Sequence, residues 1–355
     1  MAKYLKKDDL GSWLKELGET YKVIAPVEEG DAVVFRRLTD ERTLRIDRQA
    51  TQGPKGVLFP ACEELVSFKY VKDPENPEKT KVEVKETVEA EPTLIFGARP
   101  CDARGFDVFD GAFTKCAVKD NYYMARREQA IVVSLACTKT ETTCFCNWVG
   151  GSPDGTGGSD VLLTPVTGGY LVEAVTDKGE ALMGGKLLSD ADDARQAEAK
   201  KLLQEAKDSL REAPDFDCMP EQLYALFDNM DFWEKQSAKC ISCGACTYLC
   251  PTCHCFNITD EQQGKEGSRI RSWDNCMSHM FTNEASGHNP RPTKAYRLKN
   301  RVGHKFCYFP DMHDGHIACV GCGRCIKSCP VALDIREVVT AAKECRLPEE
   351  ETSDD

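Results

Sequence analysis

Residues 240–251 read Cys240-Ile-Ser-Cys243-Gly-Ala-Cys246-Thr-Tyr-Leu-Cys250-Pro251, which is the pattern C-x2-C-x2-C-x3-C-P. Residues 319–330 repeat it as Cys319-Val-Gly-Cys322-Gly-Arg-Cys325-Ile-Lys-Ser-Cys329-Pro330. In proteins with two [4Fe–4S] clusters, the first three thiolates of such a quartet hold one cluster and the fourth holds the other. The predicted ligands are therefore Cys240, Cys243, Cys246 and Cys329 for a first cluster, and Cys319, Cys322, Cys325 and Cys250 for a second.

Structural zinc is the alternative use of paired C-x2-C motifs. A zinc site needs only two cysteines from each quartet, so it leaves the other two cysteines and the proline of each quartet without a role. The complete quartets therefore favour two iron–sulfur clusters. We also expect Gly244 and Gly323 to lie where a side chain would crowd a cluster.

The composition limits the class of protein. The 355 residues include 20 cysteines and have a formal net charge of −12. No apolar run approaches the roughly 20 residues of a membrane helix, and residues 1–8 do not lead into a signal-peptide apolar region. We therefore expect a cytoplasmic protein with reduced cysteines and exclude a secreted disulfide scaffold. The negative charge argues against nucleic acid as the main partner.

We expect two domains. Residues 1–215 indicate an α+β or α/β domain, and residues 216–355 a bacterial-type, two-[4Fe–4S] ferredoxin-like domain. Runs of apolar or alternating residues predict strands at 32–35, 43–46, 93–96, 130–133, 161–166 and 170–175. Helical periodicity predicts helices over 189–212 and 221–235.

The two quartets are separated by a long insertion, residues 251–318. It contains all six histidines, together with Cys253, Cys255, Cys276 and Cys307. Its basic run, residues 290–306, contains no acidic side chain. Two hypotheses are a further metal site built from Cys253, Cys255, Cys276 and a histidine, and a basic surface for nucleic acid or a phosphorylated cofactor. We favour a simpler interpretation: buried apolar thiols, and a basic run that balances cluster and carboxylate charge or faces a partner subunit.

A third group of cysteines follows the two most apolar strands. Cys101 and Asp102 lie in the loop after 93–96, whereas Cys137 and Thr143-Cys144-Phe145-Cys146 follow 130–133. Ligands of α/β sheets commonly lie where such strands end. We therefore predict a third iron–sulfur cluster, with buried metal-free thiols as the alternative. Its ligands would be Cys101, Cys137, Cys144 and Cys146.

Six segments between about residues 59 and 338 are more specific than the quartet pattern. They are Phe96-Gly-Ala-Arg-Pro-Cys-Asp102, Thr143-Cys-Phe-Cys146, Cys250-Pro-Thr-Cys-His-Cys-Phe256, Trp273-Asp-Asn-Cys276, Gly287-His-Asn-Pro-Arg291 and Cys319-Val-Gly-Cys-Gly-Arg-Cys325. Together they resemble the family of the beta subunits of soluble [NiFe] sulfhydrogenases and the A subunit of anaerobic sulfite reductase. The resemblance implies an iron–sulfur electron carrier beside a flavin- and nicotinamide-binding subunit, and it strengthens the prediction of a third cluster.

We therefore expect an electron-transfer subunit of a hydrogenase, sulfite-reductase or heterodisulfide-reductase-like complex. It would relay single electrons between a flavin/NAD(P)-binding reductase subunit and a catalytic subunit, without catalytic residues, membrane or nucleic acid. The alternative is a catalytic subunit that acts on a sulfur substrate at an open cluster or an extra metal site. Eight cysteines have no predicted role: Cys62, Cys116, Cys218, Cys253, Cys255, Cys276, Cys307 and Cys345.

Overall fold

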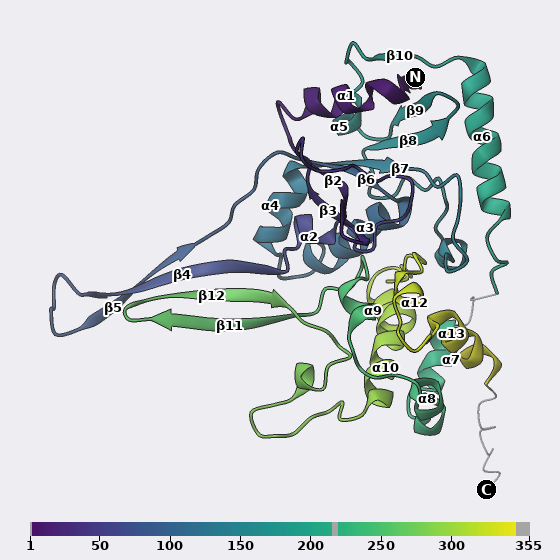
Figure 1. The fold of residues 1–355 in the computed structure, drawn as a ribbon. Helices are drawn as coiled ribbons and strands as arrows, with labels where there is room; N and C mark the ends of the chain where they lie inside the picture. The colour runs from purple at the N-terminus through teal and green to yellow at the C-terminus, as the bar shows by residue number, and fades with distance from the viewer. Residues whose placement is uncertain (1, 215–218, 346–355) are drawn as a thin grey trace, which may run out of the picture.

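The computed structural model describes residues 2–214 and 219–345, and its N-terminal part is built on a mixed eight-stranded sheet (Figure 1). The strand order is β10-β1-β9-β8-β7-β6-β2-β3. The four central strands are parallel, and the outer strands are antiparallel. The strands are β1 (Lys3–Lys6), β2 (Lys22–Glu29), β3 (Ala32–Arg37), β6 (Thr93–Ala98), β7 (Ala130–Leu135), β8 (Val161–Val166), β9 (Gly169–Ala174) and β10 (Leu188–Asp190).

Helices cover both faces of this sheet because its central strands are apolar on both sides. Every residue of β6 and β7 is buried. Phe96 packs with Trp13 on one face, and Ile95 packs with Phe106 and Phe109 on the other. The helices of this part are α1 (Leu10–Leu17), α2 (Lys55–Leu58), α3 (Pro100–Phe113), α4 (Asn121–Gln129), α5 (Asp177–Glu180) and α6 (Asp193–Asp208).

Most predicted elements of the N-terminal part are confirmed. The apolar runs 93–96 and 130–133 lie within β6 and β7, and the strands predicted at 161–166 and 170–175 are β8 and β9, which pair as a hairpin. The prediction of a strand over 43–46 is wrong, because Leu44 makes only an isolated bridge to Val27. The helix predicted over 189–212 begins late, since β10 pairs with β1 first and Asp192 then caps α6.

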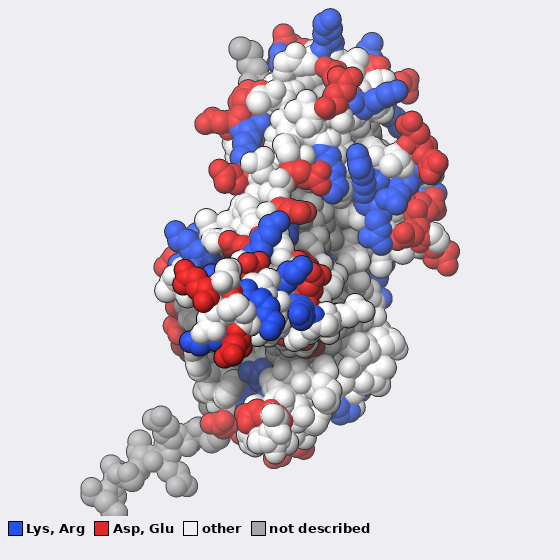
Figure 2. All heavy atoms as spheres, turned by 90° about the vertical axis from the view of Figure 1, so that its left-hand side faces the viewer, with Lys and Arg blue, Asp and Glu red and all other residues white. Residues whose placement is uncertain are grey.

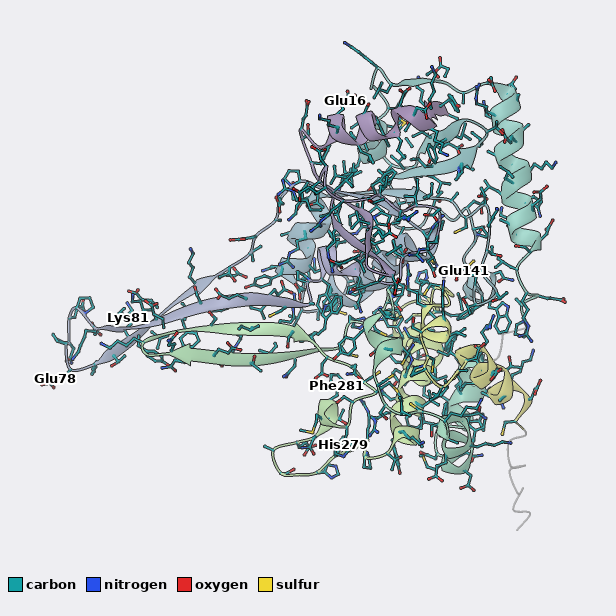
Figure 3. The ribbon with its side chains drawn as sticks, viewed as in Figure 1. Glu16, Glu78, Lys81, Glu141, His279 and Phe281 are labelled. Atoms are coloured by element: carbon teal, nitrogen blue, oxygen red, sulfur yellow. The ribbon has the colours of Figure 1, made fainter. Side chains whose placement is uncertain are left out.

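A second sheet projects from the molecule as a blade of four antiparallel strands (Figure 1). Its strands are β4 (Cys62–Lys72), β5 (Thr80–Glu86), β11 (Phe256–Gln263) and β12 (Glu266–Trp273), in the order β11-β12-β4-β5. Two hairpins that are distant in the sequence therefore form one sheet. At its base the buried Arg271 donates to Glu63 Oε1 (2.8 and 2.6 Å), and Figure 3 shows Glu78 and Lys81 at its far end.

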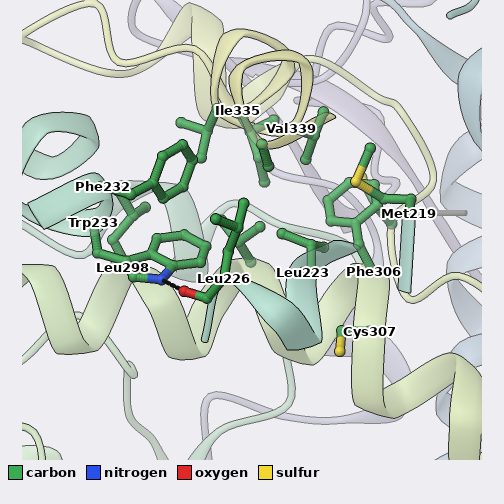
Figure 4. Packing of buried hydrophobic residues seen from close by; sticks show 14 of the residues in the cluster. Met219, Leu223, Leu226, Phe232, Trp233, Leu298, Phe306, Cys307, Ile335 and Val339 are labelled. Carbon is green, nitrogen blue, oxygen red and sulfur yellow. Dashed lines mark hydrogen bonds between the residues drawn. The ribbon is translucent and has the colours of Figure 1, made fainter. Parts of the chain in front are cut away.

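The C-terminal part packs short helices around the two quartets. The helix predicted over 221–235 is interrupted, because Asn229 caps a new helix through Phe232 N. Figure 4 shows the shared core, in which Trp233 Nε1 donates to Leu226 O (2.9 Å) beside Leu298 and Ile335. The helices are α7 (Met219–Ala225), α8 (Met230–Ser237), α9 (Ala245–Tyr248), α10 (Lys294–Gly303), the π-helical turn η4 (His304–Tyr308), α11 (Phe309–Met312), α12 (Arg324–Lys327) and α13 (Ile335–Glu344).

Two predictions fall partly or wholly on residues that the structure does not describe. The expected domain boundary at residue 215 and the unassigned Cys218 both lie outside the described residues. Among the helices that are described, none is long and apolar enough to cross a membrane.

A buried ion pair joins the two parts of the chain. Arg324 Nη1 donates to Asp102 Oδ1 (2.5 Å), and Arg324 Nη2 donates to Asp102 Oδ2 (3.0 Å). Arg324 Nε also donates to Ala50 O (2.8 Å). Both charged side chains are at most 2% exposed. Removal of one partner would leave a buried charge uncompensated, which costs about 3–5 kcal/mol.

We therefore predict that Asp102→Asn lowers the free energy of unfolding by about 3–5 kcal/mol. The matched control is Glu141→Gln. Glu141 (Figure 3) joins the same two parts through a partly exposed pair with Lys327 (2.8 Å), which is worth at most about 1 kcal/mol. Thermal unfolding under anaerobic conditions measures both variants. Equal losses would show that the buried pair has no special role.

Candidate metal centres

Cysteines from both quartets border each of two cavities. Cys240, Cys243, Cys246 and Cys329 border the first cavity. Cys319, Cys322, Cys325 and Cys250 border the second. Cys325 also reaches the first cavity, so the two cavities are neighbours. The structure thus brings together each set of four cysteines that the motif predicts, with the fourth member of each set supplied by the other quartet.

The loops that present these cysteines depend on glycine. Gly244 (φ 76°) and Gly323 (φ 74°) have left-handed backbone conformations at the starts of α9 and α12. A Cβ on Gly323 would lie 2.4 Å from Thr143 O, and one on Gly244 would lie 2.9 Å from the Asn275 side chain. Glycine is therefore required at both positions by the left-handed backbone and by the neighbouring segment. The sequence alone predicts a different reason, the crowding of a cluster.

Backbone N–H groups point toward thiols in the first site. Ser242 N donates to Cys240 Sγ (3.3 Å), and Leu333 N donates to Cys329 Sγ (3.2 Å). Bonds of this kind stabilise the charged thiolate and are one of the terms that set cluster potentials.

Two buried cations face the cavities. Arg301 borders both, whereas Lys305 borders only the second. They are 4% and 2% exposed, and no carboxylate among the described residues pairs with either. Burial lowers the pKa of Lys305, but Cys250 and Cys253 outweigh burial and raise it overall. Buried cations without carboxylates require another anion, and a cluster bound by four thiolates carries net negative charge. The residues present therefore fit a [4Fe–4S] group.

Sites for a single metal ion are the alternative to clusters. Within residues 2–214 and 219–345, no three His, Cys, Asp or Glu side chains are placed to hold one metal ion. Zinc requires four ligands at about 2.3 Å from a single ion, whereas a cubane holds its thiolates farther apart. The four cysteines that border each cavity are the observation that favours clusters at the quartets. The structure gives no support to the separate metal site hypothesised for Cys253, Cys255 and Cys276.

The insertion agrees in part with the simpler interpretation, since Cys276 and Cys307 are buried whereas Cys253 and Cys255 are only partly buried. Cys276 is buried in the core, with Cys255 packed against it, and Arg301 Nη1 donates to Cys253 Sγ (3.4 Å). Four side chains of the basic run are buried: Arg297, Lys299, Arg301 and Lys305. On the face shown in Figure 2, basic and acidic side chains are interspersed. Burial of these four side chains gives no support to the hypothesis of a nucleic-acid surface on this run.

The third group of cysteines lies against the second cavity. Phe145 borders that cavity and is flanked in the chain by Cys144 and Cys146. Phe145 N donates to Gly321 O (2.9 Å). A Cβ on Gly321 would lie 2.5 Å from Cys146 Cα, so the second quartet and the cysteine loop are in direct backbone contact.

The thiols of the third group are close enough to influence one another. Burial raises the pKa of Cys146 to about 12, and Cys137 and Cys144 add to the shift. Burial also raises the pKa of Cys137 to about 11, and it raises the pKa of Cys101, to which Cys137 contributes. Thiols in such surroundings ionise when a bound metal supplies positive charge.

One nitrogen of a nearby arginine has an unused hydrogen-bond donor beside this group. Arg104 Nη1 is buried and has no hydrogen-bond partner among the described residues. Both Arg104 Nη1 and Cys146 Cβ lie close to Gly151. A Cβ added to Gly151 would be 3.1 Å from Arg104 Nη1 and 3.3 Å from Cys146 Cβ. A buried guanidinium nitrogen with an unused donor favours an acceptor nearby, so these residues also fit a thiolate-bound cluster.

Comparison with known proteins agrees with this geometry. Residues 239–333, which contain both quartets, match the family model of a 4Fe-4S dicluster domain. The chain is 27% identical over 334 residues to "Sulfhydrogenase 2 subunit beta" of Pyrococcus furiosus, covering 93% of this chain and 94% of the relative. The chain resembles a sulfhydrogenase beta subunit. This confirms the predicted resemblance to that family of subunits. No solved structure matches the chain.

Sequence patterns did not reveal two residues that connect the sites. Gln49 Nε2 donates to Cys101 Sγ (3.8 Å) and to Cys322 O (3.1 Å), and Arg324 connects α12 to the start of α3. No local motif marks Gln49. The buried cations of α10 and η4 had one mark in the sequence, namely that the basic run contains no acidic residue that could pair with them.

The structure predicts which cysteine completes the second site. Cys250 borders the cavity, whereas Cys253, three residues later, does not and bonds to Arg301. Cys250→Ala should therefore lose about four iron atoms per chain, and the matched variant Cys253→Ala should retain them. Iron and acid-labile sulfide analysis measures both variants. The reverse pattern would assign the ligand to Cys253.

Proposed function

We propose that this chain is the iron–sulfur electron-transfer subunit of a cytoplasmic, multisubunit oxidoreductase. The supporting observation is the pair of neighbouring cavities, each bordered by three cysteines of one quartet and the last cysteine of the other. Cys325 and Arg301 border both cavities, so clusters held there would be close neighbours. The match to a dicluster domain agrees with this proposal, with residues 251–318 as an insertion between the quartets.

In this proposal each site holds one [4Fe–4S] cluster through four thiolates. The first site uses Cys240, Cys243, Cys246 and Cys329; the second uses Cys319, Cys322, Cys325 and Cys250; the third uses Cys101, Cys137, Cys144 and Cys146. A bound cluster takes up and releases one electron at a time. The chain supplies the thiolates, the N–H groups that bond to sulfur, and the burial of the site, which together set the potential.

The three sites form a series with the second in the middle. Phe145 and Gln49 lie between the second and third sites, and Arg301 lies between the first and second. The first site is the one nearest to solvent, because Cys243 is exposed and the adjacent Ile241 is 61% exposed. We propose that a partner subunit exchanges electrons at this end.

The partners follow from the same proposal. The relative from Pyrococcus furiosus is named as a subunit of a sulfhydrogenase. We propose a flavin/NAD(P)-binding reductase subunit at one end of the series, and a hydrogenase or similar catalytic subunit at the other.

No histidine borders either cavity. Burial lowers the pKa of His254 to about 4 and that of His304 to about 3, so both remain neutral at pH 7.

Metal content tests the proposal directly. Anaerobically purified protein should contain about 12 iron atoms and a similar amount of acid-labile sulfide per chain, because three cubanes are proposed. EPR of the reduced protein should show interacting one-electron centres. About eight iron atoms would remove the third site, and zinc in place of iron would overturn the proposal. Turnover of a sulfur substrate by the isolated chain with an artificial electron donor would instead favour a catalytic subunit.

A single substitution tests the third site. Cys101→Ala should lower the iron content by about four atoms per chain and leave the EPR signals of the two quartet clusters intact. Cys116→Ala is the matched control, since Cys116 is an exposed thiol near the other end of α3 and should leave the iron content unchanged. Unchanged iron in Cys101→Ala would exclude Cys101 as a necessary ligand.

A further inference from the structure

We infer that Lys305 tunes the second site. Its buried ammonium group raises the reduction potential of the second cluster and leaves that of the first unchanged. The inference rests on the proposed function, because it assigns a task within the electron relay. Without this cation, the second cluster would be harder to reduce than the first, and an electron that passes between them would meet a larger step in potential.

The two quartet sites differ in their contact with solvent. Cys250, Cys319 and Cys322 of the second site are each at most 8% exposed. In the first site Cys243 is exposed, and the other three cysteines are partly exposed. Reduction adds a negative charge to a cluster, and burial disfavours the more highly charged state. Burial alone therefore lowers the potential of the second cluster relative to the first.

Lys305 is held firmly beside the second site. Its Nζ donates to Thr252 Oγ1 (2.8 Å) and to Ala318 O (3.0 Å). Thr252 Oγ1 in turn donates to Ala318 O (2.8 Å) and contacts Cys250 Sγ (3.2 Å). Of the two partners of Lys305, Ala318 lies directly before Cys319 in the sequence, and Thr252 lies two residues after Cys250. This network fixes the ammonium group at the wall of the second cavity, which Lys305 borders, whereas it does not border the first.

The surroundings leave this charge uncancelled. The residues that border the second cavity include Arg301 and Lys305 but no aspartate or glutamate. Arg324 of the second quartet is paired with Asp102, and this ion pair is internally neutral. Charges interact more strongly in a buried site than in water and are little screened by salt. The cation therefore stabilises the reduced state of the second cluster, and it offsets the effect of burial. Arg301 borders both cavities and should act on both clusters.

The experiment is an EPR-monitored redox titration of the anaerobically purified full chain. Lys305→Met removes the charge and keeps the length of the side chain. At a fixed poise it should lower the reduced-to-oxidised ratio of one cluster at least tenfold, which equals 59 mV for one electron, and leave the other quartet cluster unchanged. Lys305→Arg keeps the charge and should stay within a factor of ten of the wild type.

Lys299→Met is the matched control. Lys299, in α10, is a second buried lysine. Its ammonium group lies over the Phe227 ring (3.9 Å), and the residue borders neither cavity. Its removal should leave both potentials unchanged. Arg301→Gln should lower the potentials of both clusters, so its effect differs in kind from that of Lys305→Met.

The outcomes separate the inference from the proposed function. Full iron content with unchanged potentials in Lys305→Met, or equal shifts of both clusters, would overturn the inference alone. If Lys305→Arg shows the same shift in potential as Lys305→Met, the role of Lys305 is purely structural, and this result would also overturn the inference. If Lys305→Met loses iron, the other two variants decide the question. Lys305→Arg should stay within a factor of ten of the wild type, and Arg301→Gln should lower the potentials of both clusters; any other result would overturn the inference. Wild-type protein without iron–sulfur signals would overturn the proposed function itself.

Discussion

The balance of charge in a small buried volume is the constraint on which the C-terminal part depends. Eight cysteines border two neighbouring cavities, and no carboxylate borders either one. Thiolates gathered in this way are stable only beside positive charge, which a metal cluster and protein cations supply together. Helix α10 meets this requirement because Arg301 faces the cavities while Leu298 and Val302 pack into the core. The π-helical turn η4 then places Lys305 four residues later, on the side of the second cavity.

The same constraint explains why the two parts of the chain cannot be separated cleanly. Arg324 lies between two cysteines of the second quartet, and its charge is balanced by Asp102 at the start of α3. Gly321 and Gly323 lack side chains because the loop that contains Cys144 and Cys146 passes directly against them. A boundary near residue 215 describes the order of the chain, but the candidate sites are assembled from both sides of it. Function and interdomain packing therefore depend on the same contacts.

The segment between the quartets has two structural roles. Its first half forms β11 and β12, which complete a sheet begun by β4 and β5 (Figure 1). Its second half forms α10 and η4, which supply the buried cations. Such a segment appears as an insertion when only the cysteine spacing is considered. In the folded protein it connects the blade, the core and the cavities, so its length follows from these tasks rather than from the quartets.

The sequence by itself determined the features that depend on neighbouring residues. The spacing of the quartets indicated which cysteines belong together, and the apolar runs indicated β6 and β7, because both patterns arise from short-range geometry. Only the tertiary structure decided the pairing of the two distant hairpins, the failure of 43–46 to form a strand, and the links made by Gln49 and Arg324. It also decided that four side chains of the basic run are buried. These outcomes depend on which surfaces meet, and a cation in a sequence has the same charge whether it faces water or a thiolate. Burial against the cysteine cavities is what gives Lys305 and Arg301 their significance.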